Sequence, residues 1–153
     1  MHKHTQQGFT LIELMVVLVI IGIASAAISL SIKPDPAHLL RQDANRLVQL
    51  LQIAQAEAQA DGRPIAWLAD NHGFRFSRRN QQGAGFDHFK TDPQLRPRAW
   101  DTAAVQVRVI PTQRVVLNAE WFDTPLQLEL SDGQNSLSVM RTAAGQFRVM
   151  NAP

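Results

Sequence analysis

The chain has 153 residues, of which 45% are hydrophobic and 18% are charged. This composition is typical of a folded protein with a single core and argues against general disorder. The formal net charge of +2 provides no broad attraction to nucleic acid. The sequence contains no cysteine, which excludes disulfides, thiolate metal sites and a cysteine nucleophile.

A short polar stretch, residues 1–8, precedes an apolar run that carries no charge from Leu14 to Ile32. As a helix, residues 9–32 are long enough to cross a hydrocarbon layer of about 30 Å. Glu13 is notable in this segment, because a carboxylate at membrane depth is costly unless something compensates it. An alternative is that Glu13 lies at the level of the lipid headgroups.

The sequence Gly8-Phe9-Thr10-Leu11-Ile12-Glu13, with the apolar run after it, resembles the N-terminus of the type IV pilin and pseudopilin superfamily. The resemblance implies that residues 1–8 are a leader. A prepilin peptidase would cut between Gly8 and Phe9 and methylate the new amino group of Phe9. Glu13 would pair with the N-terminal ammonium of a neighbouring subunit, so that the two buried charges compensate each other only on correct assembly. A membrane anchor carrying an acid by chance is the competing interpretation.

Residues 33–62 are predicted to continue the helix as an amphipathic half. Apolar residues recur there at steps of three and four, which is typical of a helix packed along one stripe: Leu40, Ala44, Leu47, Leu51, Ala54 and Ala58. We expect one long helix bent near Pro34 and Pro36, ending at Asp61-Gly62. The stripe is expected to pack on the protein's own sheet, and binding to a partner is the alternative.

From residue 63 to residue 153 the apolar period changes to two, which predicts an antiparallel β domain. The expected strands are Pro64–Ala69, Gly73–Arg78, Val105–Ile110, Arg114–Asn118, Leu126–Ser131, Ser136–Arg141 and Gln146–Met150. The expected fold class is therefore α+β, with a long N-terminal helix packed on an antiparallel β-sandwich-like domain, and the resemblance of the N-terminus implies that this fold is pilin-like.

A polar stretch from Asn80 to Ala104 interrupts the strands, and loops of this length are often functional. We interpret it as a partner-contact loop whose candidate contact residues are Phe86, Phe89 and Trp100. A short edge strand over residues 86–90 is the alternative. Trp67, Trp100 and Trp121 are themselves expected to be packing residues, and Trp121-Phe122-Asp123 is the best candidate for an exposed patch.

The residues needed for catalysis are scattered. His38, His72 and His88 are isolated and lack the spacing of a zinc site. The Asp and Glu residues are dispersed among predicted strands and turns rather than paired. We therefore expect no catalytic residue, no metal site and no cofactor, and a protein that is not an enzyme.

Charge is unevenly distributed in the β domain. Residues 63–114 contain nine Lys or Arg and four Asp, a net charge of +5. Six of these cations could contact DNA phosphates if they shared one face: Arg75, Arg78, Arg79, Lys90, Arg96 and Arg98. A solvated face or a contact with an acidic subunit is favoured, so nucleic acid is not the expected partner.

Beyond the N-terminus the chain resembles the protein H family of minor pseudopilins of type II secretion. The similar segments are Ala56-Glu57-Ala58, Asp61-Gly62-Arg63-Pro64-Ile65 and Gly73-Phe74-Arg75-Phe76. The resemblance implies a single-pass inner-membrane protein with its C-terminal domain in the periplasm. Its implied partners are other minor pseudopilins, the major pseudopilin, the prepilin peptidase and the inner-membrane assembly platform. A minor type IV pilin of pilus assembly or DNA uptake is the alternative.

Overall fold

The computed structural model describes residues 8–31, 33–118, 120 and 125–151. The chain divides into two units, Met1–Pro34 and Asp35–Pro153, each considered separately. Apart from Gly8, the predicted leader lies outside the described residues, as does the Trp121-Phe122-Asp123 candidate patch.

The first unit contains the helix α1 (Leu11–Ser31). Within it, Leu11–Ile28 is long and apolar enough to cross a membrane, and none of this window is buried. By its length and composition this exposed apolar window is suited to a hydrocarbon layer, which agrees with the predicted anchor.

The second helix, α2 (Pro36–Asp61), begins with a defined cap. The Ala37 N–H donates to Asp35 Oδ1 at 3.1 Å, and Pro36 occupies the first turn, where its missing N–H costs nothing. Gly62 ends the helix in the left-handed conformation, with φ of 64°. The expectation of one bent helix through residues 33–62 is wrong at its start, because residues 33–35 are not helical and Asp35 begins a new helix.

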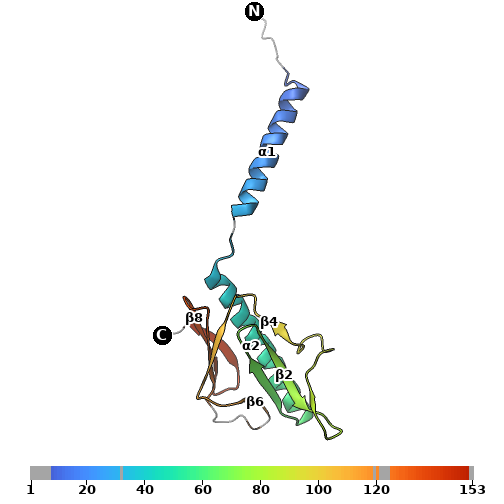
Figure 1. Ribbon diagram of the computed structural model, residues 1–153, viewed down its shortest axis with the longest axis vertical. Helices are drawn as coiled ribbons and strands as arrows, with labels where there is room; N and C mark the ends of the chain where they lie inside the picture. Colours follow the sequence, from blue (N-terminus) through green and yellow to red (C-terminus); the bar gives the residue numbers. More distant parts are fainter. Residues whose placement is uncertain (1–7, 32, 119, 121–124, 152–153) are drawn as a thin grey trace, which may run out of the picture. The chain divides into compact units, whose positions relative to one another are not determined.

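Two antiparallel sheets accompany α2 (Figure 1). The first has the order β3-β2-β1-β6, with β4 also paired to β2; its strands are β1 (Ile65–Ala69), β2 (Gly73–Arg79), β3 (Phe86–Asp87), β4 (Arg98–Ala99) and β6 (Val115–Leu117). The second has the order β5-β7-β8-β9; its strands are β5 (Gln106–Ile110), β7 (Gln127–Ser131), β8 (Ser136–Arg141) and β9 (Phe147–Asn151).

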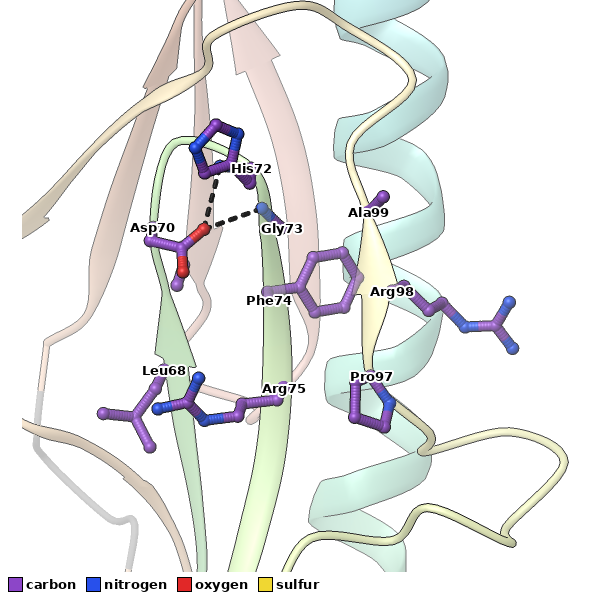
Figure 2. A pocket seen from close by; sticks show the side chains of 10 residues that line it. Leu68, Asp70, His72, Gly73, Phe74, Arg75, Pro97, Arg98 and Ala99 are labelled. Atoms are coloured by element: carbon purple, nitrogen blue, oxygen red, sulfur yellow. Dashed lines mark hydrogen bonds between the residues drawn. The ribbon is translucent and has the colours of Figure 1, made fainter.

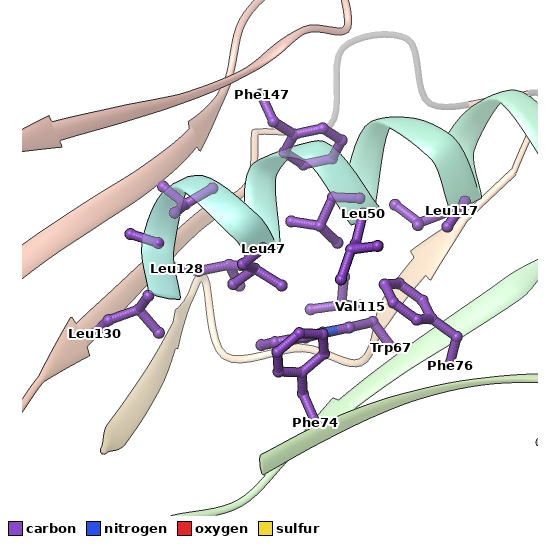
Figure 3. Packing of buried hydrophobic residues seen from close by; sticks show 14 of the residues in the cluster. Leu47, Leu50, Trp67, Phe74, Phe76, Val115, Leu117, Leu128, Leu130 and Phe147 are labelled. Atoms are coloured by element: carbon purple, nitrogen blue, oxygen red, sulfur yellow. The ribbon is translucent and has the colours of Figure 1, made fainter. Parts of the chain in front are cut away.

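The core lies where both sheets meet the apolar stripe of α2. Figure 3 shows Leu47 and Leu50 of α2 between Phe147 and Leu128 of the second sheet and Trp67, Phe74 and Val115 of the first. Each of the six predicted stripe residues is fully buried. The prediction of an α+β fold with the stripe packed on the protein's own sheet is confirmed.

All seven predicted strands are present, with ends shifted by no more than one residue. The polar stretch from residue 80 to residue 104 adds the two-residue strands β3 and β4, which are too short to show a period in sequence. The edge-strand alternative for residues 86–90 is therefore confirmed at Phe86–Asp87, which pairs with Arg78 and Arg79 of β2.

Candidate functional site

The predicted cleavage residues, Gly8 and Phe9, are exposed and precede the first helix. Gly8 and Phe9 lie outside any helix or strand, and Phe9 is 86% exposed. A peptide bond in such a segment is accessible to a protease. The predicted cleavage residues are thus sterically available.

Glu13 lies in the first turn of α1 and is exposed. Its backbone N–H is 3.3 Å from the hydroxyl oxygen of Thr10, and the Leu14 N–H donates to the Thr10 carbonyl at 3.2 Å. Thr10 therefore caps the helix, a role that the Thr-x-x-Glu spacing could have revealed. A carboxylate in the first turn also suits the helix dipole.

The loop after β3 is fastened to the core, and this overturns part of the predicted contact site. Phe89 and Trp100 are only 5% and 7% exposed, so the prediction that they contact a partner is wrong. The Phe89 ring lies under the Arg78 guanidinium, 4.9 Å from it. Phe86, at 57% exposed, is the remaining candidate.

Trp100 connects the loop to the turn between β1 and β2. Its indole N–H donates to the Asp70 carbonyl at 2.9 Å, and its backbone N–H donates to the His72 carbonyl at 3.0 Å. Its ring centroid is 4.8 Å from that of Phe74. With Trp67 also buried, the packing role predicted for these two tryptophans is confirmed.

Asp43 is a structural residue that the sequence analysis did not identify. Its carboxylate is fully buried and accepts the backbone N–H groups of Asp101 at 3.0 Å and Thr102 at 2.8 Å. Arg46 pairs with Asp43 at 2.8 Å and also donates to the Ala99 carbonyl. The sequence signal that could have identified Asp43 is its position as an acid on the apolar stripe, three residues after Leu40 and four before Leu47.

The β1–β2 turn holds an acid whose pKa is shifted. The backbone N–H groups of His72 and Gly73 donate to Asp70 Oδ1, and these bonds lower the pKa of the Asp70 carboxyl below its ordinary value. Figure 2 shows this turn, with the Arg75 guanidinium extending toward Leu68 and the Arg98 guanidinium pointing away from Phe74. The turn is explained by local hydrogen bonding and needs no catalytic role.

Two of the six cations considered for DNA contact already have partners within the described part of the protein. Arg78 turns toward α2 and pairs with Asp61 at 2.8 Å and Glu57 at 3.5 Å. Arg98 donates to the carbonyls of Pro93 and Gln94. Among the residues that the structure describes, no group of three or more His, Asp or Glu could hold a metal ion.

Comparison with known proteins defines the class of protein to which the chain belongs. Residues 3–29 match the prokaryotic N-terminal methylation motif, and the described α1 is an exposed apolar helix. The chain also resembles the minor pseudopilin EpsH from the type 2 secretion system of Vibrio cholerae, with a TM-score of 0.57 and 15% identity, over 76% of this chain and 98% of that one. Anchor and fold together define a membrane-anchored, type IV pilin-like protein.

The family follows from residues 43–145, which match the family described as Type II transport protein GspH. This match covers more than half of the chain, and the protein belongs to that family. Type II secretion system protein H of Aeromonas hydrophila is 34% identical over 80 residues. That alignment covers 52% of this chain and 44% of the relative.

Proposed function

We propose that the chain is a minor pseudopilin of the type II secretion system, a structural subunit near the tip of the periplasmic pseudopilus. One observation carries the proposal: a methylation motif at residues 3–29 and a GspH domain at residues 43–145 occur in the same chain. The named relative, a type II secretion system protein H, supports it. We further propose that the chain is not an enzyme and performs a mechanical role.

In this proposal α1 anchors the subunit in the inner membrane and the unit Asp35–Pro153 lies in the periplasm. A prepilin peptidase removes residues 1–8 and methylates Phe9. The assembly platform then inserts the subunit beside other minor pseudopilins and the major pseudopilin. Growth of the fibre pushes folded proteins toward the outer-membrane channel.

The proposal is tested by complementation. A bacterium lacking its own protein H should regain secretion of an extracellular enzyme when it expresses this chain, and mass spectrometry should find a methylated Phe9 at the mature N-terminus. Failure to restore secretion, together with restored DNA uptake or surface fibres in a strain lacking a minor pilin, would favour the type IV pilin alternative.

Glu13→Ala should leave membrane insertion intact and lower incorporation into the fibre by at least about tenfold, because an unpaired buried charge costs about 3–5 kcal/mol. Crosslinking to the major pseudopilin measures incorporation, and membrane fractionation measures insertion. Met15→Ala, on the same exposed helix, is the matched control for loss of a long side chain. Wild-type incorporation of Glu13→Ala would remove the pairing role.

A further inference from the structure

The outer face of the first sheet is uncovered within the part of the chain that the structure describes. Alternate residues of β1, β2 and β6 point away from α2, since Ile65, Trp67 and Val115 face the core. The opposite face leaves Leu68 41% exposed and Val116 37% exposed. Phe86 of β3, opposite Arg79 of β2, extends the same apolar surface.

A groove of about 400 Å³ lies on this face. Its apolar part is formed by Ala66, Phe86 and Val116, and cross-strand pairing places Ala66 directly beside Val116. Its charged part consists of arginines, and none of the described residues that line it carries a carboxylate. The groove thus combines aliphatic and aromatic surface with positive charge.

Three of these arginines have no acidic partner among the described residues: Arg63, Arg79 and Arg114 lack a carboxylate within the 4.0 Å of an ion pair. Arg63 donates to the carbonyl of Arg79, which holds its guanidinium near the groove. Arg78, the fourth arginine of the lining, is already paired with Asp61 and Glu57. The free guanidiniums therefore have unused donors, and a guanidinium binds carboxylates in a two-pronged geometry.

We propose that this groove, which we call the arginine groove (Arg63, Ala66, Arg79, Phe86, Arg114 and Val116), docks an extended segment of a neighbouring subunit that bears carboxylates beside aliphatic side chains. The inference rests on the proposed function for the identity of the partner as a pseudopilus subunit. Carboxylates would meet the three free guanidiniums, and aliphatic groups would cover Phe86 and Val116.

A protein segment fits the groove better than a nucleic acid. Nucleic acids bind along a continuous cationic track, and the engagement of Arg78 and Arg98 elsewhere breaks such a track. Phe86 and Val116 form apolar surface in the groove, and aliphatic side chains of a bound segment would remove this surface from water. A phosphate backbone has no aliphatic side chains to do so.

The first test measures binding of defined probes to the full chain in detergent micelles by fluorescence anisotropy. The probes are a labelled capped peptide of alternating Glu and Val, its Gln and Val counterpart, and single-stranded oligodeoxythymidine. We expect the acidic peptide to bind, and Arg79→Glu/Arg114→Glu to weaken it by about tenfold or more. The matched controls are Arg96→Glu and Lys90→Glu combined, which change the same net charge on exposed residues outside the groove lining.

The Phe86→Ala variant measures the apolar contribution to peptide binding separately from the contribution of the charges. It should weaken the Glu and Val peptide more than polyglutamate, because polyglutamate lacks the aliphatic groups that cover the ring. Equal binding of the acidic peptide to wild type and to Arg79→Glu/Arg114→Glu would overturn the proposal. The proposal would also be overturned if oligodeoxythymidine bound the groove as tightly as the acidic peptide does. It would be overturned as well if the matched control lost as much peptide affinity as Arg79→Glu/Arg114→Glu.

A second readout separates this inference from the proposed function. In the complementation assay, wild type should restore secretion and Arg79→Glu/Arg114→Glu should reduce it at normal protein levels. Restoration by both proteins would leave the secretion role standing and overturn the groove. Failure of wild type to restore secretion, with intact peptide binding, would count against the secretion role and leave the groove as a site for acidic segments.

Discussion

Asp43→Ala removes a fully buried carboxylate that organises the loop before β5. The N–H groups of Asp101 and Thr102 and the Arg46 guanidinium all lose this acceptor. A hydrogen bond to a charged group contributes about 1.5–3 kcal/mol, and an orphaned donor adds a desolvation cost. The Arg46 side chain is 29% exposed, so water replaces part of its lost pairing. We expect the free energy of unfolding to fall by about 3–4 kcal/mol.

Tryptophan fluorescence during unfolding of the full chain in detergent measures this loss. Trp67, Trp100 and Trp121 all belong to the second unit, so the signal reports that unit and not the anchor. At about 4 °C per kcal/mol for a unit of this size, the unfolding midpoint should fall by roughly 12–16 °C.

Asp101→Ala is the matched control for Asp43→Ala. Its carboxylate is 55% exposed and lies 3.3 Å from Arg46, so its removal should cost less than about 1 kcal/mol. If Asp43→Ala cost no more than Asp101→Ala, the buried carboxylate would not be holding the loop and the reasoning would be refuted.

Two further predictions concern the turns. Gly73→Ala should lower the free energy of unfolding by about 1–3 kcal/mol, because a Cβ there would collide with the backbone of Arg98 in β4; an unchanged denaturation midpoint would contradict this. Hydrogen bonds from the Asn135 side chain, and then from backbone N–H groups, lower the pKa of Asp132 below its ordinary 3.8. The stabilisation is therefore complete above pH 3.8 and is lost as pH falls through the lower folded pKa. Asp132→Asn should flatten this acid dependence in pH-dependent unfolding, and an unchanged slope would exclude the contribution.

The buried residues that could be identified from sequence are those whose positions follow a local period. Leu40, Leu47 and Leu51 recur at helical steps, and the strand Gln127–Ser131 alternates, so burial follows directly from the pattern. Phe89 and Trp100 could not be placed this way. They belong to a stretch without a period, and their burial depends on contacts with Arg78 and Asp70 from distant strands.

The sequence by itself indicated the apolar anchor helix and the α+β class, and it predicted cleavage between Gly8 and Phe9 and pairing by Glu13, because each depends on neighbours along the chain. Only the tertiary structure decided that the buried Asp43 carboxylate accepts the Thr102 N–H in the loop before β5 and that Arg78 faces α2. It also decided that Arg63, Arg79 and Arg114 meet at one groove. Those outcomes depend on which strands pair and which face each side chain takes, and the pairing joins residues far apart in sequence.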